Sequence, residues 1–190
     1  EIDEVTETLN SQWLGLGNKV EEFEDLFSKK FNLQYFSMVD SGSNALFLAL
    51  KLLNLPKNSE VILPSFTWVS CAQAVLMCDL KPVFCDVDIN SMNITAKTVA
   101  TKITSRTSAI MVVHYAGLPV DMEPIIKFGI PIIEDAAHAV YSKYKGSQCG
   151  SIGDIGIYSF DAVKNLTCAE GGGITSKSKE IIDRAQEILS

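Results

Sequence analysis

Short apolar runs alternate with helix-compatible stretches along almost the whole chain, and this pattern limits the fold more than any other feature. The runs are typical of buried strands and lie at residues 60–63, 82–87, 109–114, 131–134, 155–160 and 172–175. Helix-compatible stretches separate most of them, at 44–54, 67–78, 95–103 and 121–128, and amphipathic helices are expected at 18–30 and 181–189. Strands that alternate with helices predict an α/β fold, in which helices cover both faces of a largely parallel central sheet in three αβα layers.

The length and composition fit a single domain with one core. The chain has 190 residues, of which 47% are hydrophobic, and no linker or internal repeat divides it. Its longest apolar stretches, such as 109–113, are too short to span a bilayer. A formal charge of −7 without a Lys/Arg cluster argues against nucleic acid and anionic membranes as partners.

The cysteines and the N-terminus favour a cytoplasmic protein. Five cysteines without a C-x-x-C pair argue against a disulfide framework and against a zinc site. We therefore expect no metal, and reduced thiols that pack as small hydrophobic side chains. Residues 1–4 have neither the basic nor the apolar part of a signal peptide, and the missing initiator Met indicates a chain cut from a longer one.

Polar and ionisable residues gather where four of the predicted strands end. Open parallel sheets bind ligands at the carboxyl ends of their strands, so we expect these residues to face one active-site crevice. They are Asp86 and Asp88, His114, then Glu134, Asp135 and His138, and finally Ser159 and Lys164. A purely structural sheet does not need such residues at four strands, and the pattern therefore favours an active site.

Lys164 is the sharpest candidate for chemistry. It follows a buried strand and lies among largely uncharged neighbours. Desolvation there would lower the pKa of its amine and yield a nucleophile suited to a Schiff base, whereas the alternative is an ordinary solvated lysine. Ser159, at the end of the same strand, could donate its hydroxyl to a phosphate on the same ligand.

Three further segments could hold other parts of such a ligand. Residues 40–44 (DSGSN) begin a helix, where free N–H groups bind anions, although Ser43 could equally be an ordinary N-cap. Trp68 could stack on a planar ring or fill the core. Asp135 could pair with a heteroaromatic N–H⁺ or cap a helix. An aldehyde, a phosphate, a flat ring and a pyridine nitrogen together describe pyridoxal phosphate (PLP).

Six motifs occur in the order found in sugar aminotransferases of the DegT/StrS type, and the chain resembles that family from about residue 2 to about residue 176. The motifs are 41–43 (SGS), 64–68 (PSFTW), 113–117 (VHYAG), 134–139 (EDAAHA), 144–146 (YKG) and 159–165 (SFDAVKN). The resemblance implies the large domain of a PLP-dependent transferase with the aspartate-aminotransferase type of fold, over residues 1–190. It also implies a C-terminal small domain absent from this chain, and a homodimer with a shared active site.

The resemblance assigns a role to each residue that matches a motif. Lys164 would form the Schiff base and move the proton between the cofactor and the substrate carbon. Asp135 would pair with the pyridine nitrogen, Trp68 would stack on the ring, and His138 would lie near its phenolic oxygen.

The resemblance also implies a phosphate site and a pair of substrates. The phosphate would be held by Ser43, Asn44 and Ser159. L-glutamate would donate the amino group, and a keto carbon of a nucleotide-linked sugar would accept it. Residues 164–172 are most similar to members that aminate the sugar at C4, such as those that make the 4-amino-4-deoxyarabinose nucleotide used to modify lipid A.

Two departures from the family pattern and two alternative functions stay open at this point. His138 stands where many members have Gln, and Asp161 stands where an aromatic residue or His is common. Sugar dehydratases of the family carry a His in place of the Schiff-base lysine, so Lys164 argues against that activity. The other alternative is a non-catalytic or regulatory fragment with the same fold, which covalent binding of the cofactor would distinguish from an enzyme.

Overall fold

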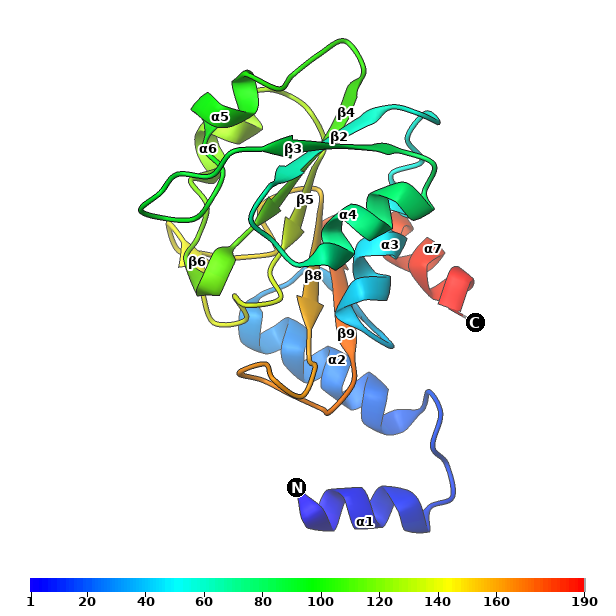
Figure 1. Ribbon diagram of the computed structural model, residues 1–190. Coiled ribbons are helices and arrows are strands. Elements are labelled where there is room, and N and C mark those ends of the chain that lie inside the picture. Colours follow the sequence, from blue (N-terminus) through cyan, green and yellow to red (C-terminus); the bar gives the residue numbers. More distant parts are fainter. Residues whose placement is uncertain (190) are drawn as a thin grey trace.

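The computed structural model describes residues 1–189 and has three αβα layers around a seven-stranded sheet (Figure 1). The strands lie in the order β1-β9-β8-β5-β4-β2-β3. They are β1 (Tyr35–Val39), β2 (Glu60–Pro64), β3 (Lys81–Cys85), β4 (Thr107–Val113), β5 (Ile132–Asp135), β8 (Ile155–Ser159) and β9 (Gly172–Ser176). Only β9 runs antiparallel to its neighbours, β1 and β8, within this sheet. The prediction of a largely parallel sheet is therefore confirmed.

Helices cover both faces of the sheet and bury three apolar clusters against it. One face carries α3 (Gly42–Leu52), α4 (Val69–Met77) and α7 (Lys179–Leu189) over a single cluster. The other face carries α2 (Asn18–Phe31) over one cluster, and α5 (Ala96–Ala100) with α6 (Met122–Ile126) over another. This double coverage explains why strands such as β2 and β8 are buried at every position.

The position of α3 matters most for function, because its N-terminus lies beside the carboxyl end of β8. Most of its side chains are buried against the sheet, α4 and α7, among them Leu46 and Leu50. Each such leucine contributes about 1.5–3 kcal/mol of burial free energy, which fixes the helix in place. The segment before α3 therefore has a defined position relative to the strand ends.

Four elements of the structure were absent from the sequence prediction. They are β1, the helix α1 (Ile2–Asn10), and the strands β6 (Lys143–Tyr144) and β7 (Ser147–Gln148), which pair as a small hairpin. The strand β1 contains Ser37 and pairs with β9, so a distant partner rather than a local apolar run decides it. The expected helix at 95–103 is shorter in the structure.

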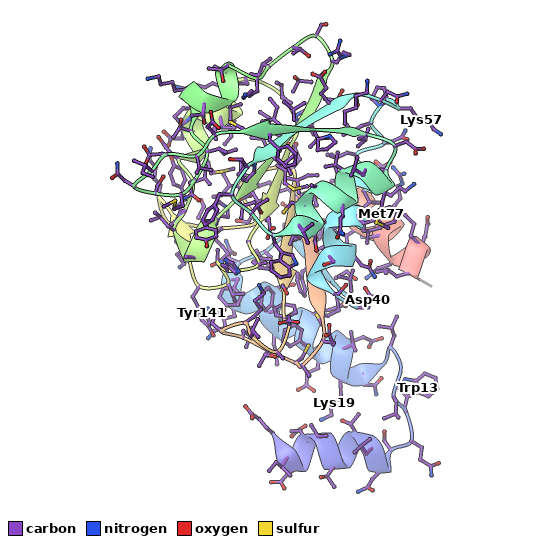
Figure 2. The ribbon with its side chains drawn as sticks, viewed as in Figure 1. Trp13, Lys19, Asp40, Lys57, Met77 and Tyr141 are labelled. Carbon is purple, nitrogen blue, oxygen red and sulfur yellow. The ribbon has the colours of Figure 1, made fainter. Side chains whose placement is uncertain are left out.

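The helix α1 lies apart from the rest of the molecule and has no buried residue (Figure 1). Figure 2 shows Lys19 between α2 and α1, where its Nζ lies 2.7 Å from Glu4 and 3.9 Å from Glu7. The apolar side chains of Ile2 and Leu9 are exposed. No helix within residues 1–189 has both the length and the apolar character needed to cross a membrane.

Candidate active site

A cavity of about 480 Å³ opens at the carboxyl ends of β5 and β8, beside the N-termini of α3 and α4. Six of the seven residues predicted to bind a cofactor line it: Ser43, Trp68, Asp135, His138, Ser159 and Lys164. Asn44 does not line the cavity. The strand ends thus bring most of the candidate site together, as expected for an open parallel sheet.

The N-terminus of α3 differs in detail from the sequence prediction. Its N-cap is Ser41, whose Oγ accepts the backbone N–H of Asn44 at 3.2 Å, so the alternative with Ser43 as the N-cap is wrong. Ser43 instead lies in the first turn, with its Oγ 2.7 Å from Ser70 Oγ. The side-chain amide of Asn44 donates to Asp40 Oδ2 at 2.6 Å, which holds it outside the cavity.

Two glycines let the start of α3 approach the sheet closely. A Cβ on Gly42 would lie 2.8 Å from Ser159 Cβ and 3.1 Å from its Oγ. A Cβ on Gly172 would lie 2.6 Å from the backbone nitrogen of Gly42. Neither position has room for a methyl group, so only glycine allows this close approach. The approach brings serine hydroxyls and the free N–H groups of α3 together in a cradle suited to an anion.

We expect Gly42→Ala to weaken anion binding in this cradle by about tenfold or more. The added methyl must displace Ser159 from the helix N-terminus, at a cost of about 1–3 kcal/mol in stability. Thermal unfolding with and without phosphate measures both effects. Gly15→Ala is the matched control, because a Cβ there meets nothing within 4 Å. Equal phosphate stabilisation of both variants would contradict the role of the cradle.

Asp135 is the last residue of β5 and is buried, with 5% of its surface exposed. Its Oδ1 accepts the backbone N–H of Ala137 at 3.0 Å, and its Oδ2 accepts the thiol of Cys71 at 3.2 Å. The next regular element after it is the strand β6, so the helix-cap alternative is wrong. Within residues 1–189, none of the salt bridges involves this carboxylate. The carboxylate is therefore open to a cationic N–H of a ligand.

Trp68 and His138 contribute ring systems to the cavity. Trp68 is the N-cap of α4 and is 74% exposed, which excludes the alternative that it fills the core. His138 Nδ1 accepts the backbone N–H of Ala116 at 3.3 Å, so the neutral ring carries its proton on Nε2. Burial, and next the charge of Lys164, lower the pKa of His138, while Asp135 opposes them. At neutral pH the imidazole is thus a neutral Nε2–H donor.

Lys164 reaches the cavity from a tight turn after β8. Its backbone N–H donates to the carbonyl of Asp161 at 2.9 Å, and Asp161 Oδ1 accepts the N–H of Val163 at 3.0 Å. The Lys164 side chain is half-buried and lines the same cavity as Asp135 and His138. Its amine is therefore available to a ligand held by the other groups.

Other residues at the strand ends do not reach the cavity, which corrects the prediction of a single crevice. His114 and Glu134 are fully buried, and His114 Nε2 lies 2.8 Å from Glu134 Oε2. Successive residues of a strand point to opposite faces, so Glu134 faces away from the side that Asp135 faces. Asp88 instead accepts two backbone N–H groups within its own turn, and Asp86 is exposed beyond the edge strand β3.

The comparison with known proteins identifies the chain's family. Residues 1–190 match the DegT/DnrJ/EryC1/StrS aminotransferase family along their whole length. The chain belongs to this family. SpsC, the spore coat polysaccharide biosynthesis protein of Bacillus subtilis, is 42% identical over 188 residues, which are 97% of this chain and 48% of SpsC.

Solved structures of similar proteins have the same fold. The aminotransferase TlmJ from Streptoalloteichus hindustanus has a TM-score of 0.94 at 38% identity, over 98% of this chain and 52% of TlmJ. A GDP-4-keto-6-deoxymannose-3-dehydratase with a trapped PLP-glutamate geminal diamine has a TM-score of 0.93 at 28% identity, over 97% of this chain and 50% of its own. The chain spans about half the length of the curated relatives it matches.

Aminotransferases of this family use PLP, and the cavity fits that cofactor. The cradle at Gly42 suits a phosphate, and the Asp135 carboxylate suits a protonated ring nitrogen. Trp68 offers an exposed ring face, and Lys164 offers an amine to the aldehyde. PLP supplies an electron sink that stabilises negative charge on the substrate carbon.

Several residues at or behind the cavity wall escaped the sequence analysis. Ser70 contacts Ser43, Cys71 contacts Asp135, and the Tyr115 ring lies 6.0 Å from that of His138. Ser70 and Cys71 lie in the first turn of α4, which begins directly after the 64–68 motif, and this position is the signal that could have found them.

The thiols also differ from the prediction of purely hydrophobic packing. All five cysteines are free, but Cys168 is exposed and Cys71 forms hydrogen bonds. Within residues 1–189, no group of three or more His, Cys, Asp or Glu side chains is arranged to hold a metal ion.

Proposed function

We propose that the protein is a PLP-dependent aminotransferase that transfers an amino group from L-glutamate to a keto carbon, C4, of a nucleotide-linked sugar. The observation that carries this proposal is the gathering of Lys164, Asp135, Trp68 and Ser159 around one cavity of the family fold. We further propose that the product enters the synthesis of a lipopolysaccharide or another cell-surface polysaccharide. The name of SpsC, a spore coat polysaccharide biosynthesis protein, supports that assignment.

The proposed chemistry divides the work among residues of this chain. Lys164 Nζ would hold the cofactor through its aldehyde, with loss of water, and the same amine would carry the proton that moves at the substrate carbon. The buried Asp135 carboxylate holds a protonated ring nitrogen, and Trp68 covers one ring face. His138 donates Nε2–H toward the ring's phenolic oxygen. Ser43 and Ser159 bind the phosphate beside the N-terminus of α3.

The assembly and location are part of the same proposal. We propose a cytoplasmic homodimer with a shared active site, as the family resemblance implies. Exposed apolar side chains on α4 and around the cavity, including Val69, Met77 and Val163, support a surface that is covered in the assembly.

A sugar dehydratase is the second candidate, because a solved dehydratase has the same fold at 28% identity. Lys164 favours the aminotransferase, since it lies in the cavity where the family's dehydratases are expected to have His. Incubation with glutamate and a keto-sugar nucleotide distinguishes the two activities: a transaminase gives an amino sugar and 2-oxoglutarate, whereas a dehydratase gives a deoxy sugar.

The test of the proposed function is a visible absorbance titration of the full-length protein with PLP, followed by borohydride reduction and peptide mass mapping. We expect a new visible band and a label on Lys164. NMR of the sugar product then identifies the aminated carbon, which we expect to be C4. A folded protein that takes up no PLP would contradict the proposal and favour a non-catalytic or regulatory role.

A further inference from the structure

Cys71 links the first turn of α4 to the carboxylate at the end of β5. Its side chain is fully buried, and its Sγ lies 3.2 Å from Asp135 Oδ2 and 3.2 Å from Thr67 Oγ1. Thr67 and Asp135 line the cavity, whereas Cys71 does not. The thiol therefore lies behind the cavity wall and contacts a residue that faces the ligand.

The direction of these two hydrogen bonds follows from the protons available. A thiol has one proton and a carboxylate has none, so the Cys71 S–H donates to Asp135 Oδ2. The Thr67 hydroxyl then donates to Cys71 Sγ. Burial, and next the charge of Asp135, raise the pKa of the Cys71 thiol far above its usual value, so the thiol keeps its proton. Two consecutive hydrogen bonds, called the relay below, thus connect Thr67 through Cys71 to the Asp135 carboxylate.

The relay limits the orientation of the Asp135 carboxylate. Oδ1 is held by the N–H of Ala137 and Oδ2 by Cys71, so rotation of the group would break a hydrogen bond at one oxygen or the other. Because Asp135 also lines the cavity, lone pairs that these two hydrogen bonds do not use can accept from a ligand there. Trp68 is the N-cap of α4 and Cys71 lies in its first turn. The same turn of α4 therefore holds the indole ring of Trp68 and the thiol that contacts the Asp135 carboxylate.

We propose that Cys71 is a positioning residue that fixes Asp135 Oδ2 and thereby sets how tightly and in which orientation the site holds the PLP ring. The inference rests on the proposed function, because it requires PLP in this cavity. It differs from the sequence-based expectation that Cys71 is only a small packing residue.

The test compares Cys71 variants of the full-length protein in PLP titrations and in the visible circular dichroism of bound PLP, which reports ring orientation. Cys71→Ala removes the donor, and Cys71→Ser restores one of similar size. We expect Cys71→Ala to weaken PLP affinity about fivefold and to reduce the dichroism per bound PLP. Cys71→Ser should stay within about twofold of the wild type in affinity. Cys71→Val fills the site without a donor and should show the same losses as Cys71→Ala. It replaces the alanine variant in these measurements if that variant proves unstable.

Two controls separate positioning from packing. Cys85 is also fully buried but donates to the backbone carbonyl of Asp86 on the other face of the sheet, so Cys85→Ala should change thermal stability and not PLP affinity. In an Asp135→Asn background, Cys71→Ala should cause little further loss, because the effect acts through Asp135.

The possible failures are distinct. Wild-type affinity and dichroism in Cys71→Ala would overturn this inference, as would no rescue by Cys71→Ser or full additivity with Asp135→Asn. Those results leave the proposed function intact if wild-type protein still takes up PLP on Lys164. A folded wild-type protein that takes up no PLP would overturn the proposed function and this inference together.

Discussion

Replacement of Lys164 by alanine should abolish covalent attachment of PLP and lower amino transfer by at least about 10³-fold. Lys164 lines the cavity, and in the proposed function its side chain supplies both the amine that would attach the aldehyde and the base that would move the substrate proton. Lys164 lies in a turn beyond β8 and is half-buried, so the fold should change by no more than about 0.5 kcal/mol. Borohydride reduction with peptide mapping measures the attachment, and a coupled assay for 2-oxoglutarate measures the transfer.

Two control variants separate the nucleophile from the charge. Lys164→Arg keeps a positive charge in the cavity but cannot form a Schiff base, so it should fail in the same way as Lys164→Ala. Lys127→Ala removes an exposed lysine at the C-cap of α6, far from the cavity lining, and should behave as wild type. A borohydride-stable adduct at another lysine of Lys164→Ala would reject the assignment.

The fold was largely predictable because buried strands need continuous apolar runs. The runs that become β2, β4 and β5 lie in the middle of the sheet, with helices on both faces, and the sequence shows them directly. The edge strand β1 has no such signature, since Ser37 interrupts it and pairing with β9, far along the chain, stabilises it. The helix α1 is held by the salt bridges of Lys19 rather than by burial, so no core pattern identifies it.

The members of the candidate site were predictable where a single side chain lies at or just beyond the end of a single strand. Asp135, Ser159 and Lys164 follow directly from the ends of β5 and β8. Glu134 was misplaced because a shift of one residue changes the face of the strand, and the sequence does not give the register. Its four hydrogen bonds, to His114 and to the N–H groups of residues 150, 152 and 153, serve the opposite side of the sheet.

The contacts that support the site were not predictable, because they join distant segments. Cys71 and Asp135 are 64 residues apart, and Ser43 and Ser70 are 27 apart. The first contact depends on how α4 packs on β5, and the second on how α3 and α4 pack side by side. The whole core sets both arrangements. A local motif reveals the groups that meet a ligand but not the groups that orient them.

Replacement of Asp135 by asparagine should leave PLP attached to Lys164 but reduce amino transfer by about 10²–10⁴-fold. In the proposed function the buried carboxylate would stabilise a cationic ring nitrogen as an ion pair, and a neutral amide of the same size would not. In the variant the amide oxygen can accept the N–H of Ala137, and the amide –NH2 can donate to Cys71 Sγ in place of accepting its proton, so the local structure is largely kept. PLP affinity should fall as well, because a hydrogen bond to a charged group is worth about 1.5–3 kcal/mol.

Asp161→Asn is the matched control for Asp135→Asn, because Asp161 also lines the cavity but its Oδ1 accepts the N–H of Val163 within its own turn. We expect nearly normal turnover from it, since an amide oxygen can accept the same bond. Single-turnover kinetics with glutamate, monitored through the visible absorbance band of bound PLP, compare the two variants directly. Wild-type rates in Asp135→Asn would reject its role, and equal losses in both variants would show that the net negative charge of the cavity, rather than an ion pair at the ring nitrogen, controls the reaction. A large loss confined to Asp135→Asn is the result that the burial of this carboxylate, and its lack of a counter-ion among residues 1–189, lead us to expect.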